Sequence, residues 1–335
     1  MKTLIALVAT LSLSGCWLGE STTITVTVPK RLVSPPPDII VPLPAQQPPD
    51  AFVVLVMGQS NAVGRAEVQR LANTTGNPLG YVPNPPNVRI YAKGNFQSPD
   101  LTVDNGQWQP YYAGLNSNTD GSPFDHFGPE LSMSQQITRR TGKPVYIIKA
   151  AFGGTALSPG IPTYAPGNWT DTITAAAMNN FLAPAMRDLA IAQPNARIRI
   201  LGVIWWQGET DAAANVPGWE YQSRFGTLKS TVNARLAAYA QPDPIRWFIP
   251  GLSFSRTPAE AAISASQCAA ANASTDSQFF STLAYPNKLQ LTAAQSAPTG
   301  TMPYDDIHSS YLAQIAVGEA AANWLLGGQK VTCTP

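Results

Sequence analysis

Runs of apolar residues recur along the chain at intervals typical of alternating strands and helices. Residues 52–57 are apolar at every position and rich in valine, as expected for a strand buried on both faces of a parallel sheet. Similar runs occupy residues 145–148, 198–206 and 245–249, and residues 288–291 form a weaker candidate. These runs predict four or five strands of one sheet.

Between and after these runs, apolar residues recur every three or four positions, which predicts amphipathic helices. One covers residues 221–239, and another covers residues 312–324 and ends before Gly327-Gly328. A third, over residues 178–189, should kink or split at Pro184. Strands that alternate with helices predict an α/β chain folded as a three-layer α/β/α sandwich.

The first sixteen residues predict a targeting segment that is not part of this fold. Lys2 precedes an apolar run at residues 4–13, which suits a signal peptide and is too short to span a bilayer. The run ends in Leu-Ser-Gly-Cys at residues 13–16, which resembles the lipobox of bacterial lipoproteins. That resemblance implies lipidation of Cys16 and an exported protein, anchored on the periplasmic side of the envelope or at the cell surface. The alternative is an ordinary cleaved signal peptide with an unrelated cysteine.

Residues 17–50 predict a spacer. They contain a run of threonines and valines, then Pro35-Pro36-Pro37 and Pro48-Pro49. Such proline density keeps a segment extended and leaves it without a core of its own. The catalytic or binding body is therefore expected over residues 51–335.

Two cysteines remain in that body, Cys268 and Cys333. An exported protein lives in an oxidising compartment, so we expect these two to form a disulfide that ties the C-terminal tail to the body. The alternative is a pair of free, buried thiols.

The low charge of the chain limits the kinds of partner that it can bind electrostatically. Charged residues make up 12% of the 335-residue chain and the formal net charge is +1. Neither a basic stripe nor an acidic tail is present, so nucleic acid has no electrostatic support as a partner. A neutral or weakly charged substrate fits this composition better.

Residues 65–127 lack a clear period and are rich in Asn, Pro and Gly. A long loop in a compact domain is usually functional, and this one carries the aromatic residues Tyr81, Tyr91, Trp108, Tyr111 and Tyr112. One interpretation is a wall over an active site, with rings that stack on sugars. The other is an insertion with a small core of its own. Trp205 and Trp206 invite the same sugar-stacking interpretation, although a buried Trp is more often core.

Two segments carry the residues of serine-dependent chemistry. Ser60 lies in Gly58-Gln59-Ser60-Asn61, directly after the first strand, where reactive groups of open α/β sheets gather. The chain has two histidines, and serine hydrolysis at neutral pH needs an imidazole to accept the hydroxyl proton. Asp305 stands three residues before His308, a spacing that allows the carboxylate to orient the imidazole. His126 lies in a loop and is expected to be structural.

Two further segments follow strands. Gly153 and Gly154 leave backbone N–H groups free to approach a substrate closely. Gln207 can offer a side-chain N–H to a developing oxyanion. Glu209 and Asp211 resemble a glycosidase carboxylate pair or metal ligands, but we expect them to organise neighbouring loops by hydrogen bonds.

The ordered set of these segments resembles the SGNH hydrolases, in the branch of sialate O-acetylesterases and acetylxylan esterases. The matching segments are Gly58-Gln59-Ser60-Asn61, Phe127-Gly128-Pro129-Glu130, Gly153-Gly154-Thr155, Trp206-Gln207-Gly208-Glu209 and Asp305-x-x-His308. The resemblance spans nearly the whole body and implies a flavodoxin-like sandwich with a short parallel sheet.

The resemblance also implies roles for single residues. Ser60 would be the nucleophile, His308 the general base and Asp305 its orienting partner. The backbone N–H groups of Ser60 and of Gly153, or else Gly154, would form the oxyanion hole with Gln207 as a third donor. Gln59, Asn61 and Glu209 would support the site. The reaction needs no metal or organic cofactor.

The implied function is hydrolysis of O-acetyl esters on carbohydrate through an acetyl-enzyme. Within enzymes, the alternatives are a lipase, a thioesterase or a peptidoglycan O-acetylesterase. Outside enzymes, they are a carbohydrate-binding lipoprotein that keeps the fold and a structural surface protein. Xylan, sialic acid, pectin and peptidoglycan all remain open as acetylated substrates.

Overall fold

A computed structural model describes residues 50–72, 77–92, 106–115, 117, 126–163, 167–239, 244–285 and 308–334. The predicted signal peptide, Cys16, the spacer up to residue 49, the weak strand at 288–291 and Asp305 lie outside these residues. Residues 47–335 group into one unit by their internal contacts.

Seven strands of the described chain form the main sheet, in the order β4-β3-β6-β1-β7-β8-β9. Their bounds are β1 Asp50–Gly58, β3 Val88–Ala92, β4 Gln107–Pro110, β6 Val145–Ala151, β7 Arg197–Trp206, β8 Arg246–Pro250 and β9 Ser277–Phe280. Strands β3 and β4 pair antiparallel, and the other neighbours pair parallel. The continuous apolar run of β1 is explained by its place in the middle of this sheet, where side chains on both faces are covered.

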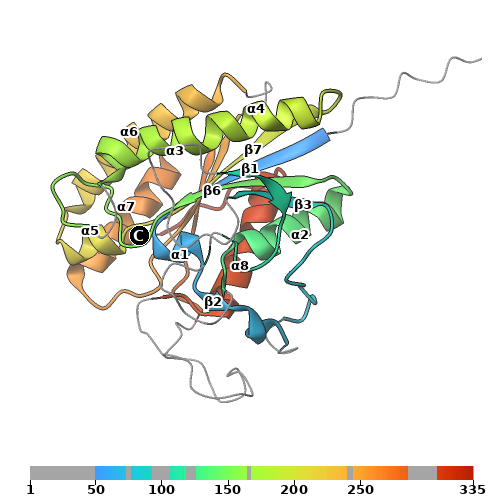
Figure 1. The fold of residues 1–335 in the computed structure, drawn as a ribbon. Coiled ribbons are helices and arrows are strands. Elements are labelled where there is room, and N and C mark those ends of the chain that lie inside the picture. Colours follow the sequence, from blue (N-terminus) through green and yellow to red (C-terminus); the bar gives the residue numbers. More distant parts are fainter. Residues whose placement is uncertain are drawn as a thin grey trace, which may run out of the picture. The chain divides into compact units, whose positions relative to one another are not determined.

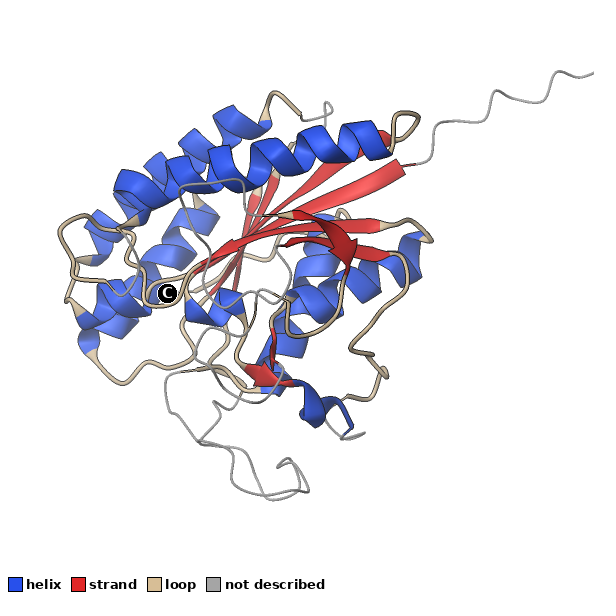
Figure 2. Cartoon of the chain, in the orientation of Figure 1, coloured by secondary structure: helices blue, strands red, loops and turns tan. Residues whose placement is uncertain are grey.

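Helices cover both faces, as Figures 1 and 2 show. On one face, Val53 and Leu55 of β1 pack in a core with residues of the helices that run from α3 to α7. On the other, Val54 and Val56 pack in a second core with residues of α1, α2 and α8. The helix bounds are α1 Ser60–Val63, α2 Glu130–Thr141, α3 Thr174–Ala177, α4 Ala183–Ala192, α5 Glu209–Ala213, α6 Gly218–Leu236, α7 Pro258–Asn272 and α8 Tyr311–Leu325.

Short elements complete the described chain. They are the 3₁₀ turn Val68–Ala72, the π-helical turns Trp169–Ile173 and Met178–Leu182, and a two-stranded sheet of β2 (Ala66–Glu67) and β5 (His126–Phe127). None of the helices in the described ranges combines the length and apolarity that a membrane span requires.

The structure confirms the predicted α/β sandwich with its short, mostly parallel sheet. The four stronger strand predictions correspond to β1, β6, β7 and β8. The predicted split at Pro184 is not present: a π-helical turn ends at Leu182, α4 begins at Ala183 with the proline in its first turn, and the backbone stays helical between them. The longer elements that were not predicted are β3, β4, β9, α2 and α7.

Three of the five aromatic residues named in the 65–127 stretch are core residues, so a sugar cannot stack on them. Tyr81, Tyr91 and Tyr111 are buried, and β3 and β4 extend the main sheet rather than an insertion with a separate core. The Trp108 ring packs edge-on against Tyr91 and Tyr146. Trp205 and Trp206 are also completely buried, as core residues.

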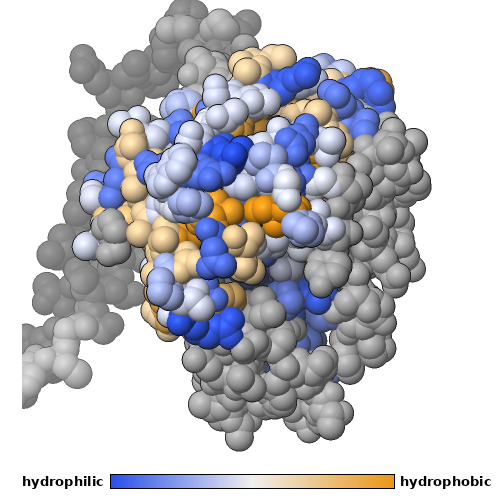
Figure 3. All heavy atoms as spheres, turned by 90° about the vertical axis from the view of Figure 1, so that its left-hand side faces the viewer, coloured by the Kyte–Doolittle hydropathy of each residue, from blue (hydrophilic) through white to orange (hydrophobic). Residues whose placement is uncertain are grey.

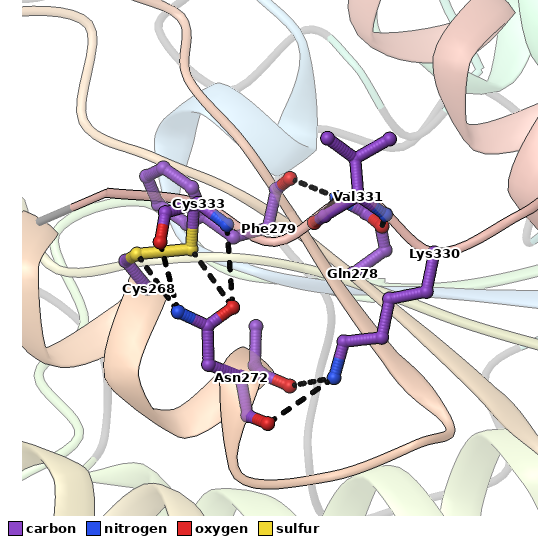
Figure 4. The surroundings of a disulfide bond; sticks show 8 residues. Cys268, Asn272, Gln278, Phe279, Lys330, Val331 and Cys333 are labelled. Carbon is purple, nitrogen blue, oxygen red and sulfur yellow. Dashed lines mark hydrogen bonds between the residues drawn. A yellow bond between two sulfur atoms is a disulfide. The ribbon is translucent and has the colours of Figure 1, made fainter.

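The C-terminal tail is fastened to α7 by the predicted disulfide between Cys268 and Cys333, whose Cα atoms are 5.9 Å apart (Figure 4). Asn272 Nδ2 donates to the Cys333 carbonyl at 2.9 Å. The Lys330 amine donates to the Ala271 carbonyl at 2.7 Å and to that of Ser274. A cation beside the unpaired carbonyls of a helix C-terminus is favourable, so the tail also caps α7.

Candidate active site

Three neighbouring strands end together and bring their following loops to one edge of the sheet. Gly58 at the end of β1 pairs with Ala151 of β6 on one side and with Trp206 of β7 on the other. The Phe152 N–H donates to the Gly58 carbonyl and the Gln59 N–H donates to the Trp206 carbonyl, each at 2.9 Å. The segments that hold Ser60, Gly153 and Gln207 therefore start side by side, at the edge where open α/β sheets bind ligands.

This edge lies on the left-hand side of Figure 1, because β1 runs in that direction to α1. Figure 3 views the molecule from that side and shows apolar residues exposed near the middle of the face, bordered by polar ones. The face thus offers both apolar and hydrogen-bonding surface to a ligand.

Ser60 opens the single turn of α1 and is half-buried. A glycine is required two residues earlier, since Gly58 has a φ of +134° and a Cβ there would stand 2.1 Å from the Trp206 carbonyl oxygen. The close contact between β1 and β7 fixes the start of the Ser60 turn. Within the described ranges the Ser60 hydroxyl forms no hydrogen bond with another protein group.

Two backbone N–H groups at this edge of the sheet are also available. Across the described part of the chain, the N–H groups of Ser60 and Gly153 donate no hydrogen bond. Gly154 has a φ of +67°, in the left-handed region that favours glycine. A Cβ built at Gly153 would meet nothing within 4 Å, so this backbone borders open space. Unpaired N–H groups at such an edge can stabilise an anion that forms there.

Asn61, the residue after Ser60, connects this turn to three other segments. Its side-chain Nδ2 donates to Glu209 Oε1 at 2.6 Å and to Ser253 Oγ at 3.2 Å. Its Oδ1 accepts from the Ser309 N–H at 2.9 Å, and its carbonyl accepts from Gln314 Nε2 at 3.1 Å. The fully buried Asn61 therefore joins α1, the loop after β8 and the start of α8.

These bonds locate the segment of His308. The histidine is half-buried and directly precedes Ser309, so residues adjacent to Ser60 and His308 are bonded to each other. His126, in contrast, is buried in β5 opposite Glu67, which agrees with the expected structural role. The orienting role of Asp305 stays a prediction, because that residue lies outside the described ranges.

Glu209 is buried at the start of α5 and accepts the Asn61 bond. Burial raises the pKa of this carboxyl to about 7, and the hydrogen bond from Asn61 opposes that rise. The second oxygen, Oε2, is buried without a hydrogen-bond partner among the described residues.

Gln207 differs from the oxyanion donor that the sequence suggested. Its side chain is fully buried, and Nε2 donates to Asp211 Oδ2 at 2.6 Å, the Thr155 carbonyl at 3.1 Å and Gln59 Oε1 at 3.2 Å. An amide nitrogen has two protons, and both have protein acceptors here. The contacts make Gln207 and Gln59 a structural link between the loops that follow β1, β6 and β7.

Asp211 organises a neighbouring loop, as predicted. Its carboxylate accepts from the backbone N–H groups of Leu157 at 2.7 Å and Ser158 at 2.9 Å. These bonds, with the one from Gln207, hold the segment after Gly153-Gly154 against the start of α5.

A buried ion pair that the sequence analysis missed supports the Ser60 turn from inside. Lys149 of β6 and Glu130 of α2 are completely buried, with Nζ 2.8 Å from Oε1. The amine also donates to the Val63 carbonyl at 2.6 Å, at the end of α1, and to Ser117 Oγ at 2.7 Å. Burial lowers the pKa of Lys149, whereas the Glu130 carboxylate raises it. The sequence did contain a signal for this pair: Lys149 interrupts an apolar strand, and a buried cation needs a partner of opposite charge.

Ser253, Ser309 and Gln314 were missed for a different reason. Serine and glutamine occur throughout the chain, and nothing in their spacing distinguishes these three from the rest. Their contacts with Asn61 span sequence separations of 192, 248 and 253 residues.

A pocket of about 580 Å³ lies elsewhere, between α7, β9, α8 and the C-terminal tail. Phe248, Phe280, Trp324 and the disulfide contribute to its lining. It shares no residue with the cluster around Ser60, Gly153 and Asn61, so its size alone does not make it the catalytic site.

Most of the chain matches a known protein family. Residues 50–326 match the family described as carbohydrate esterase, sialic acid-specific acetylesterase. A comparison with curated proteins gives no match.

Two solved structures have a similar fold at low sequence identity. The structure of NanS has a TM-score of 0.57 at 17% identity, covering 84% of this chain and 98% of that one. A protein from Arabidopsis thaliana has a TM-score of 0.56 at 15% identity, covering 85% of this chain and 100% of that one. With a family match over most of its length, the chain belongs to the sialic acid-specific acetylesterase family of carbohydrate esterases and is a carbohydrate acetylesterase.

Proposed function

We propose that this esterase removes O-acetyl groups from carbohydrate by acyl transfer to Ser60. His308 accepts the hydroxyl proton as Ser60 attacks the acetyl carbonyl, and then protonates the departing sugar oxygen. A water molecule activated by the same imidazole hydrolyses the acetyl-enzyme, which releases acetate and restores Ser60. Asp305 orients the imidazole.

The observation that carries this proposal is the bond from the Ser309 N–H to Asn61 Oδ1 at 2.9 Å. It ties the residue after His308 to the residue after Ser60, although the two segments are separated by most of the chain. This bond supports the proposal, because a nucleophile and its base have to lie close together.

The oxyanion hole of the proposal uses the backbone N–H groups of Ser60 and Gly153. Both lack a hydrogen-bond partner among the described residues, and both follow adjacent strands at the same edge. Gln207 is left out of the oxyanion hole, because it would have to release Asp211 and Thr155 first.

For the carbohydrate, we infer that Trp219 supplies the aromatic surface. Of the tryptophans in the described residues, Trp219 is the exposed one, with 73% of its surface accessible. It lies in the first turn of α6, the helix whose Tyr221 hydroxyl donates to the Gln207 carbonyl at 2.9 Å. An exposed, rigid ring offers a sugar an apolar face at low entropic cost.

Acetate release measured on acetylated xylan, O-acetylated sialic acid, acetylated pectin and O-acetylated peptidoglycan tests the activity and its substrate together. We expect release from at least one of them, and labelling of Ser60 by a fluorophosphonate, located by peptide mass spectrometry. A preference for long-chain nitrophenyl esters would favour a lipase or thioesterase instead. Absence of both labelling and turnover would favour a carbohydrate-binding lipoprotein.

We also propose that the protein is exported and anchored to a bacterial membrane through lipid on Cys16. The support is the sequence Leu-Ser-Gly-Cys after a short apolar run. When the full chain is expressed in bacteria, the wild type should sediment with membranes and carry acyl chains on its N-terminal peptide. Cys16→Ser should be soluble, and a membrane-bound Cys16→Ser variant would contradict the proposal.

A further inference from the structure

Ser253 lies in the loop that follows β8, beside the proposed catalytic residues but outside the set that sequence motifs identify. Strand β8 is the neighbour of β7, so this loop emerges at the same edge of the sheet as Ser60 and Gly153. The side chain is buried, with 7% of its surface exposed. A substrate therefore has little access to it, and its contacts define what it does.

Those contacts face two ways. On one side, Ser253 Oγ accepts from Asn61 Nδ2 at 3.2 Å. On the other, it lies 2.5 Å from Ser309 Oγ in a buried hydroxyl pair. The Ser253 hydroxyl thus stands between the residue after Ser60 and the residue after His308.

Buried hydrogen bonds hold the backbone before Ser253. The Thr282 hydroxyl donates to the carbonyls of Gly251 at 3.1 Å and Leu252 at 2.6 Å. Trp206 Nε1 donates to the same Gly251 carbonyl at 3.0 Å. These bonds hold the backbone that carries Ser253, and the contacts with Asn61 and Ser309 hold its hydroxyl.

We propose that Ser253 is a positioning residue that fixes the His308–Ser309 segment against the Ser60 turn. Ser309 is held twice, by its N–H on Asn61 and by its hydroxyl on Ser253. A single hydrogen bond would let the peptide between His308 and Ser309 rotate about that bond. Two hydrogen bonds to Ser309 restrict this rotation and so restrict the orientation of the imidazole. Helix α8 begins only after the N-cap Ser310, so its regular hydrogen bonds do not hold His308. This inference rests on the proposed role of His308 as the base.

A double-mutant cycle on Ser253 and Ser309 tests the inference. Ser253→Ala and Ser309→Ala remove the same hydroxyl pair, so we expect each to lower kcat for a small acetyl ester about 10- to 100-fold, the range for a misplaced catalytic group. KM should stay within about twofold, because neither side chain is accessible to substrate. The double variant should lose no more than the stronger single variant.

Ser132→Ala is the matched control. This serine is completely buried and donates to the Ile315 carbonyl of α8 at 2.9 Å, and it forms no hydrogen bond with Asn61, Ser253 or Ser309. Its removal should lower the melting temperature and leave kcat unchanged. Ser309→Ala decides the question if Ser253→Ala does not fold.

Several results would overturn the positioning role. They are wild-type kcat in either serine variant, additive losses in the double variant, or a loss of kcat that Ser132→Ala shows equally. If instead the proposed function is wrong, Ser60→Ala keeps its activity, which distinguishes that outcome from failure of the positioning role. A dead Ser60→Ala with a fully active Ser253→Ala rejects the role of Ser253 alone.

Discussion

Asn61 accepts a 2.9 Å hydrogen bond from the backbone N–H of Ser309, across a sequence separation of 248 residues. The same amide donates to Glu209, which lies after a third strand. One buried side chain therefore fixes the relative positions of α1, α5 and the start of α8. The proposed partnership of Ser60 and His308 depends on this arrangement, because Asn61 and Ser309 are their neighbours in the chain.

Glu209→Gln should remove a pH-dependent cost of folding. The pKa of Glu209 is raised from 4.5 to about 7, so the folded state holds this proton more tightly than the unfolded state does. Stability from this group is complete below about pH 4.5 and is lost as pH rises to about 7, a change of about 3 kcal/mol. Gln keeps an oxygen for Asn61 and does not ionise.

The measurement is urea unfolding of both proteins at pH 5 and pH 8. The variant should gain stability relative to the wild type by about 3 kcal/mol between the two pH values. An equal difference at both pH values would show that the carboxyl is not perturbed by burial.

Lys149→Met should destabilise the fold strongly, because it leaves the Glu130 carboxylate buried without its cation. Breaking one partner of such a pair costs about 3–5 kcal/mol. Adding Glu130→Gln should recover part of that loss, since the remaining group is then neutral. Denaturant unfolding of the single and double variants measures both effects, and a double variant no more stable than Lys149→Met would argue against the ion pair.

Replacing both cysteines of the disulfide should affect stability and not catalysis. The bond between Cys268 and Cys333 closes a sequence separation of 65 residues, and such cross-links contribute about 2–4 kcal/mol. The double Cys→Ser variant should melt at a lower temperature, as should the reduced wild type, with kcat unchanged. A large loss of kcat at a temperature where the variant is folded would mean that the tail contributes to the site.

Trp219→Ala should raise KM for an acetylated polysaccharide about 3- to 10-fold, the range expected for loss of one aromatic contact. KM for nitrophenyl acetate should not change, because that ester is too small to reach the ring while bound at Ser60. Ile191→Ala is the matched control, since Ile191 is equally exposed, at 73%, near the end of α4. Unchanged polysaccharide kinetics in Trp219→Ala would remove this residue from the binding surface.

The fold was predictable where a strand is covered on both faces, because its sequence is then continuously apolar. Strands β1, β6, β7 and β8 are apolar because helices cover both faces of the sheet. Edge strand β9 and the antiparallel pair β3–β4 are short and contain both polar and apolar residues, so no continuous apolar run identifies them. Helix α7 is rich in alanine and serine, which gives a weak apolar period.

The site was predictable as a set of motifs and not as a set of contacts. Ser60, Gly153 and Glu209 follow strand ends, where sequence reasoning expects function. The role of a buried polar side chain depends on partners that are remote in sequence, so Gln207 was taken for an oxyanion donor although its amide holds Asp211 and Thr155. Aromatic residues raise the same difficulty: Tyr91 and Trp205 are core, and only the fold distinguishes them from the exposed Trp219.

Acetate release by purified Ser60→Ala, compared with wild type on the same acetylated carbohydrate, tests the central claim most directly. With the nucleophile removed and the fold verified by its melting temperature, turnover should fall at least about 10³-fold. Near-normal acetate release by the folded Ser60→Ala protein would contradict the assignment of this hydroxyl as the nucleophile.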